Sequence, residues 1–189
     1  MRVKVDFEQK LRERAAVIAN TVISQQAFYS SPDCSYNQKQ LLETMVGAAL
    51  WYLPQSNKMW TGCISIGAVK EFVNSSKPKS VKLTKDHHYP RKVSAAELFS
   101  LDWKEIEDPV AEVYNRYVER YGQYNYVLPL ENKQLVKYQK TNTFTSPEES
   151  YRQAGIELVS LTTEQLWDLR TGNRSLAAEL IVTRASLKL

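Results

Sequence analysis

Hydrophobic residues recur at helical spacing along much of the chain, and this pattern predicts a mainly helical protein. In residues 7–26 apolar side chains follow one another every three or four positions, and Asp6 precedes them as a helix N-cap. Residues 37–52 repeat the pattern until Pro54 ends it. These two segments are expected to form a helical hairpin. Residues 60–72 fit either a short strand or a helix.

Two short strands are predicted in the middle of the chain. Residues 80–85 alternate polar and apolar side chains as a half-buried strand does, and residues 124–127 form a second candidate strand. Between them, a capping-box pattern at 94–97 and an Asp-Pro start at 108–121 predict two helices. Residues 130–139 have helical spacing again. The predicted order is therefore strand, helical insertion, strand, helix.

The rest of the chain predicts further helices around one short extended piece. Capping patterns at 146–149 and 162–165 each open a helix, residues 156–159 are extended, and a last helix starts near residue 175. We accordingly divide the chain into an N-terminal helical region (1–76), a central region (77–145) and a C-terminal helical region (146–189). The fold class expected from these patterns is α+β with mostly helices.

Composition adds few constraints. The 189 residues are 43% hydrophobic and 24% charged, which is typical of a globular protein with a packed core. Two cysteines, Cys34 and Cys63, form neither a disulfide framework nor a zinc ribbon. No apolar run approaches the roughly 20 residues needed to cross a bilayer, and the first residues lack the apolar core of a signal peptide. We therefore expect a cytoplasmic protein with no membrane partner.

The chemistry-bearing residues are concentrated in residues 77–92. This segment holds six basic residues against one acid, Asp86. Basic surface stretches are common and often only solvated. Here, however, both histidines of the chain, His87 and His88, lie inside the cluster and beside the carboxylate. A neutral imidazole can take a proton from water, and a carboxylate is a hard oxygen ligand for Mg²⁺ or Mn²⁺. This combination favours phosphodiester hydrolysis.

Two motifs resemble those of a known family. The run Asp-His-His-Tyr-Pro-Arg-Lys at 86–92 resembles the Asp/Glu-His-x-x-Pro-Arg opening of HNH endonucleases, and Glu-Asn-Lys-Gln-Leu at 131–135 resembles the Asn-x-x-Leu of their metal-site helix. The resemblance spans residues 86–142, under a third of the chain. It implies a small ββα-metal motif within the helical α+β protein. It also implies a DNA endonuclease, a hydrolase of the homing, restriction or phage-encoded kind, which acts on double-stranded DNA with Mg²⁺ or Mn²⁺.

Position by position, the resemblance assigns a role to several residues. His87 would be the general base, Asp86 a metal ligand, and Asn132 the residue that braces the loop holding the base. Arg91 would contact the scissile or a neighbouring phosphate together with Lys92. The nucleic-acid-binding residues are then Lys82, Lys85, Arg91 and Lys92.

The last metal ligand and the identity of the base stay open. The family usually supplies a His or Asn from its helix, but no histidine follows residue 88, so Gln139 or Asn142 would serve here. In a second register, similar to the His-His pair of bacterial toxin nucleases, His87 would be the ligand and His88 the base. The Asp-His-x-x-Pro spacing favours His87 as the base.

Two other classes of function compete with the nuclease. One is a non-catalytic module that binds nucleic acid or protein on a degenerate ββα-metal scaffold, and the other is a structural or inhibitory protein with a basic surface. The first helix is a candidate for DNA contacts or for homodimer contacts through its basic residues, Lys4, Lys10, Arg12 and Arg14. No nucleotide-binding glycine-rich loop occurs in the sequence.

Overall fold

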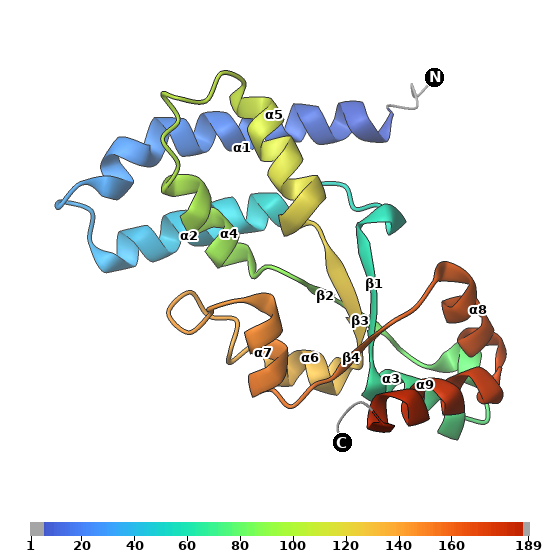
Figure 1. Cartoon of the computed structure of the whole chain (residues 1–189). Coiled ribbons are helices and arrows are strands. Elements are labelled where there is room, and N and C mark those ends of the chain that lie inside the picture. The colour runs from blue at the N-terminus through green and yellow to red at the C-terminus, as the bar shows by residue number, and fades with distance from the viewer. Residues whose placement is uncertain (1–5, 187–189) are drawn as a thin grey trace. The chain divides into compact units, whose positions relative to one another are not determined.

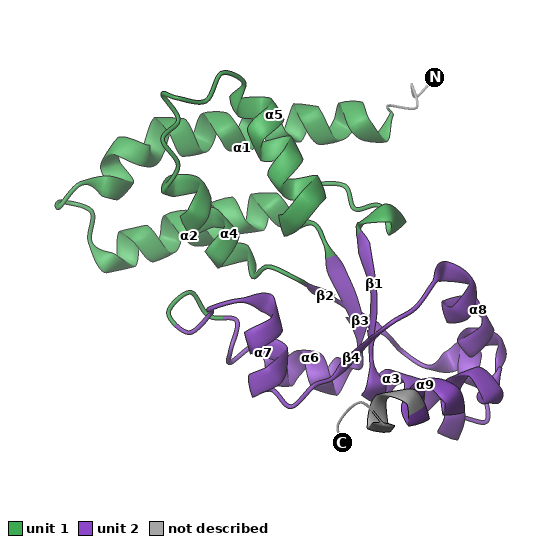
Figure 2. Ribbon diagram, viewed as in Figure 1, with its two compact units in different colours: residues 1–59, 88–123, 140–142 green, residues 60–87, 124–139, 143–189 purple. Residues whose placement is uncertain are grey.

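The computed structural model describes residues 6–186 and divides the chain into two compact units (Figure 2). Unit 1 comprises residues 1–59, 88–123 and 140–142. Unit 2 comprises residues 60–87, 124–139 and 143–189. Both units are therefore assembled from segments that are distant in sequence. Lys4, one of the candidate contact residues of the first helix, lies outside the described residues.

Unit 1 is helical. Its elements are α1 (Phe7–Ser30), α2 (Tyr36–Trp51), the short 3₁₀ turn η1 (Asn57–Met59), α4 (Arg91–Phe99), α5 (Pro109–Arg116) and the π-helical turn η3 (Tyr117–Tyr121). The predicted hairpin is present, because α1 packs on α2, and α5 and α4 pack on these two helices (Figure 1). Asp6 caps α1 by accepting a hydrogen bond from the Phe7 amide (2.8 Å), as predicted. The predicted apolar stripe of α1 is buried from Leu11 to Val22, whereas Phe7 at its start is exposed.

The start of α4 differs from the prediction. The helix begins at Arg91 after Pro90, whose φ of −62° already suits a helix start, and not at the Ser94 capping box. Ser94 is buried inside the helix, where its hydroxyl donates to the Pro90 carbonyl (3.2 Å). α4 lies very close to α2, since a Cβ added at Gly47 would stand 3.0 Å from the Arg91 carbonyl oxygen. The absence of a side chain at Gly47 therefore sets this helix spacing.

Unit 2 contains a four-stranded mixed sheet with strand order β2-β3-β1-β4. The strands are β1 (Trp60–Ser65), β2 (Thr84–His87), β3 (Tyr124–Val127) and β4 (Leu158–Ser160). β2 runs antiparallel to β3, β3 runs parallel to β1, and β4 runs antiparallel to β1. The helical elements are α3 (Ile66–Asn74), η2 (Pro78–Ser80), α6 (Pro129–Leu135), α7 (Pro147–Gln153), α8 (Thr163–Thr171) and α9 (Arg174–Ser186).

Two apolar clusters pack in this unit. The larger is centred on Ile64 of β1 and Phe72 of α3, and it includes residues of α8 and α9. The smaller joins Val127 at the end of β3, Leu135 of α6 and Tyr151 of α7. Tyr126 packs against the larger cluster and Val127 belongs to the smaller one, as expected when neighbouring strand residues point to opposite faces. The sheet of unit 2 is therefore covered on both faces.

The predicted elements of unit 2 are present with shifted boundaries. The ambiguous segment 60–72 is a strand followed by a helix, and Ser65 caps that helix by accepting from the Ala68 amide (3.1 Å). The strand predicted at 80–85 lies at 84–87, because Pro78 starts a 3₁₀ turn before it. The helix predicted at 130–139 ends at Leu135 and continues as turns. The mainly helical α+β class is confirmed.

Within residues 6–186, none of the helices combines the length and the apolar character needed to cross a membrane.

Candidate functional site

The last two residues of β2 carry the predicted acid and base of the site. In the antiparallel pair, Asp86 lies opposite Asn125 and His87 lies opposite Tyr124. Side chains alternate along a strand, so Asp86 and Asn125 share one face of the sheet while His87 and Tyr124 share the other. On the face of His87, the Lys85 ammonium lies 4.3 Å from the centre of the Tyr124 ring. The acid and the base thus leave the strand in different directions.

Asp86 is buried and hydrogen-bonded to residues from two other segments. Its side chain accepts a hydrogen bond from the Tyr151 hydroxyl of α7. It also accepts hydrogen bonds from the side-chain amide of Gln139, whose Nε2 lies 3.3 Å from Oδ1 and 3.2 Å from Oδ2. Asp86 is 4% exposed, so its carboxylate depends on these protein donors for hydrogen bonds. The structure therefore brings together Asp86 and Gln139, two of the three predicted metal ligands.

The hydrogen bonds continue beyond Tyr151. Asn125 Nδ2 donates to the Tyr151 hydroxyl oxygen (3.0 Å), and the Thr61 hydroxyl donates to Asn125 Oδ1. The amide of Cys63 in turn donates to Thr61 Oγ1 (3.1 Å). A chain of polar groups therefore runs from β1 through β3 and α7 to the carboxylate on β2. We call Thr61, Asn125, Tyr151, Asp86 and Gln139 the Asp86 network.

Burial changes the acidity of this network. Loss of hydration raises the pKa of Asp86 to about 6, and the hydrogen bonds from Tyr151 and Gln139 only partly oppose that increase. The pKa of the Tyr151 hydroxyl is also raised, mainly by burial and further by the neighbouring Asp86. The phenol therefore keeps its proton, which it donates to the carboxylate.

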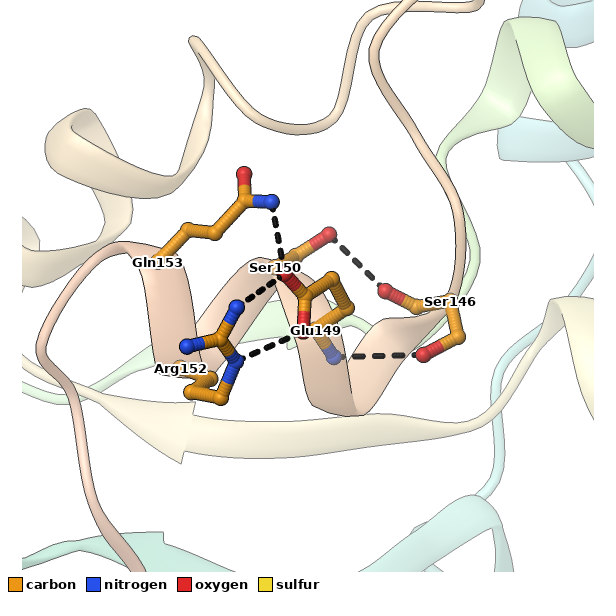
Figure 3. Close-up of polar contacts among 5 residues, drawn as sticks. All are labelled: Ser146, Glu149, Ser150, Arg152 and Gln153. Carbon is orange, nitrogen blue, oxygen red and sulfur yellow. Dashed lines mark hydrogen bonds and ion pairs between the residues drawn. The ribbon is translucent and has the colours of Figure 1, made fainter.

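The helix that carries Tyr151 is fixed by its own polar contacts (Figure 3). Ser146 caps α7 by accepting from the Glu149 amide (3.1 Å). The Glu149 carboxylate binds Arg152 in two contacts of 2.6 and 2.7 Å and accepts from Gln153 Nε2 (2.7 Å). Hydrogen bonds from Arg152 and Gln153 hold the pKa of Glu149 down to about 2. These contacts stabilise the short helix on which Tyr151 reaches Asp86.

The two histidines belong to different units. His87 is half-buried at the end of β2 in unit 2. His88 is in unit 1, where its backbone amide donates to the Gln123 carbonyl (2.9 Å) and its ring lies 6.0 Å from that of Tyr89. The roles of His87 and His88 as base or ligand stay predictions.

The remaining predicted helix residues are also divided between the units. Asn132 lies in the first turn of α6 in unit 2, where it is half-buried. Its backbone amide donates to the Leu128 carbonyl (3.0 Å). Gln139 lies in the turns after α6. Asn142 belongs to unit 1. Gln139 is thus the candidate last ligand for which the structure shows a contact with Asp86.

The predicted nucleic-acid-binding residues have distinct surroundings. In unit 2, Lys82 is exposed before β2, and Lys85 covers an aromatic ring. In unit 1, the Arg91 guanidinium lies 4.2 Å from the centre of the Trp51 ring at the start of α4. Lys92 Nζ donates to Gln40 Oε1 (3.0 Å) and so helps to hold α4 on α2. Arg91 is exposed, whereas Lys92 is half-buried.

The donor atoms at the site are of the type that a hard cation binds. In the part of the chain that the structure describes, no three His, Cys, Asp or Glu side chains cluster as a metal site would need. The Asp86 carboxylate and the Gln139 amide oxygen are nevertheless both ligands of the type that Mg²⁺ and Mn²⁺ accept, and such ions usually keep several waters. Asp86 and Gln139 are therefore the residues that would hold the ion.

Three members of the Asp86 network were not predicted from the sequence: Thr61, Asn125 and Tyr151. Asn125 had a misleading signal, because a polar residue between two tyrosines of a predicted strand is expected to face solvent, whereas the structure buries it. Thr61 and Tyr151 had none, since their contacts join segments far apart in the sequence.

No protein-family model, curated protein or solved structure was found to match this chain.

Proposed function

We propose that this protein is a divalent-metal-dependent endonuclease of the HNH type that hydrolyses phosphodiester bonds of double-stranded DNA. The observation that carries the proposal is the contact between Asp86 at the end of β2 and Gln139 after α6, which are 53 residues apart in the sequence. The sequence predicts Asp86 as a metal ligand and offers Gln139 or Asn142 as the last one. The Nε2 atom of Gln139 lies 3.2 Å from Asp86 Oδ2.

The order of elements supports the proposal. An antiparallel pair, β2 and β3, is followed directly by α6, and Asp86 faces the side of the sheet on which Leu135 of α6 packs. The resemblance implies the same sequence of two strands and a helix, with the acid and the base at the end of the first strand. The insertion between the strands contributes α4 and α5 to unit 1.

In the proposed mechanism, His87 takes a proton from the water that attacks the phosphorus atom. Asp86 and Gln139 would hold Mg²⁺ or Mn²⁺, and the ion would supply positive charge to offset the negative charge of the phosphate and of the departing 3′ oxygen. Asn132 braces the loop that carries the base. The phosphates are bound by the basic residues Lys82, Lys85, Arg91 and Lys92.

Incubation of supercoiled plasmid with the full-length protein and Mg²⁺ or Mn²⁺ tests this function. We expect nicked or linear DNA, no product in EDTA, and no product with His87→Ala. His88→Ala is measured beside it, because His88 is the base in the second register and His87 is then the ligand. Loss of cleavage with retained Mn²⁺ binding identifies the base, and loss of both identifies a ligand. Cleavage that survives both EDTA and His87→Ala would refute the proposal.

A second function, a non-catalytic module that binds nucleic acid or protein, is favoured by one observation. The Asp86 carboxylate is buried and already accepts hydrogen bonds from Tyr151 and Gln139, as expected of a purely structural polar network. This function predicts DNA binding that weakens steeply with salt, without cleavage at any metal concentration. Sedimentation with and without a DNA duplex tests the homodimer for which the basic first helix is a candidate.

A further inference from the structure

The Asp86 network is directional, because each link fixes the proton of the next. Thr61 Oγ1 accepts from the Cys63 amide, and its own hydroxyl proton goes to Asn125 Oδ1. The other end of that side chain, Asn125 Nδ2, donates to the Tyr151 oxygen at 3.0 Å. The tyrosine hydroxyl has one proton, which is donated to Asp86 Oδ2. All protons of the chain therefore point toward the carboxylate.

The two oxygens of Asp86 are held unequally as a result. Oδ2 accepts the tyrosine proton at the end of the polarised chain, where neighbouring hydrogen bonds strengthen one another. Oδ1 has a weaker partner, because the Gln139 amide nitrogen lies 3.3 Å from it and is shared with Oδ2 at 3.2 Å. These lengths lie at the long end of the usual range for N–H···O bonds.

Gln139 is also the less constrained of the two partners. It lies in the turns after α6 and is half-buried, whereas Tyr151 is 4% exposed and lies in a helix. A side-chain amide carries an oxygen beside its nitrogen, so rotation of this group exchanges a donor to Asp86 for a ligand oxygen. Tyr151 has no such alternative while Asn125 donates to it.

We propose that Tyr151 is the positioning residue of the metal site: it fixes Asp86 through Oδ2 and leaves Oδ1 to the divalent cation. Gln139 would offer its amide oxygen to the ion after rotation of its side-chain amide. This inference rests on the proposed function and deepens it, because it names the group that orients the ligand. Hydrogen-bond partners of metal ligands typically change metal affinity by about 10- to 100-fold when removed.

The test compares Mn²⁺ binding by the full-length wild type, Tyr151→Phe and Tyr126→Phe, followed by electron paramagnetic resonance of free Mn²⁺. Tyr126→Phe is the matched control, because it removes a phenol hydroxyl from the opposite face of the same sheet. We expect the Kd for Mn²⁺ to rise about 10-fold or more in Tyr151→Phe and to stay within about 2-fold in the control. Urea unfolding in EDTA gives the folded fraction of each variant, so that affinities are compared for folded protein.

The outcomes separate this inference from the proposed function. Mn²⁺ binding that is equal in wild type and Tyr151→Phe would overturn the positioning role and leave the nuclease intact. No Mn²⁺ uptake by the wild type would overturn both. Should Tyr151→Phe fail to fold, Thr61→Val keeps the phenol and removes the proton donated to Asn125. A several-fold weaker Mn²⁺ affinity is then expected, and unchanged affinity would overturn the inference.

Discussion

The buried carboxylate of Asp86 makes the stability of the protein depend on pH in the absence of metal. Burial raises the pKa of Asp86 from 3.8 to about 6 in the folded chain. Between these two values the native state holds a proton that the unfolded chain has released. The free energy of unfolding therefore falls as the pH rises from about 4 to about 6. At about 1.4 kcal/mol per pH unit of difference, this decrease amounts to roughly 3 kcal/mol.

Asp86→Asn isolates this contribution, because an amide stays neutral throughout the range. Urea unfolding of wild type and variant in EDTA, at intervals from pH 4 to 8, gives their difference in stability, in which the titration of other groups cancels. We expect this difference to shift in favour of Asp86→Asn by up to about 3 kcal/mol between pH 4 and pH 7. Asp33→Asn, in an exposed turn of unit 1, is the control and should follow the wild type.

The slope of this difference decides between two opposing effects at one carboxylate. Burial favours the protonated acid, whereas donors such as Tyr151 and Gln139 favour the charged form. A stability difference that stays constant with pH would show that the two effects balance. A difference that shifts in favour of the wild type would show that the hydrogen bonds dominate, and would refute the raised pKa of Asp86.

Two glycines give further predictions about packing. Gly67→Ala would place a Cβ against Glu131 Oε1. The Glu131 carboxylate is held in place, because it also accepts from Ser65 Oγ (2.5 Å) and from the Leu128 amide (2.8 Å), so we expect a loss of about 1–3 kcal/mol in urea unfolding. If the clash is the cause, combining it with Glu131→Ala should make the glycine substitution harmless, and an additive effect would contradict this explanation. Gly47→Ala would meet the Arg91 carbonyl of α4 at 3.0 Å, and we expect a similar loss in thermal unfolding, whereas an unchanged Tm would show that α2 and α4 separate freely.

Local signals in the sequence predicted the elements well where a side chain acts on its own backbone. Asp108 caps α5 by accepting from the Val110 and Ala111 amides, and Thr162 caps α8 in the same way through Gln165. The helix start predicted from the capping box at Ser94 was wrong, because this side chain does not cap the helix. Its hydroxyl bonds to a carbonyl one turn back inside the helix, which is an alternative partner that sequence spacing alone does not exclude.

The candidate site was predictable only in part, because its partners come from different segments. The motif at 86–92 predicted Asp86 as a ligand, and the segment after the second strand offered Gln139 or Asn142 as the last ligand. The structure brings Gln139 into contact with Asp86. Tyr151 follows a helix-capping pattern and carries no local sign of its contact with a strand 65 residues earlier. Long-range hydrogen bonds of this kind depend on the topology of the sheet, which hydrophobic periodicity does not determine.

A network that serves only the fold has no need of a carboxylate at its centre. A neutral acceptor would satisfy the Tyr151 hydroxyl without the cost of burying a charge, so on a purely structural account Asp86→Asn gains stability at neutral pH and loses nothing else. A carboxylate kept for binding a cation predicts a trade-off. Asp86→Asn then becomes more stable in EDTA but loses Mn²⁺ uptake, and Mn²⁺ at 100 times its Kd stabilises only the wild type, by about 2.7 kcal/mol. Stabilisation of both proteins by Mn²⁺ to the same extent would exclude Asp86 as the ligand.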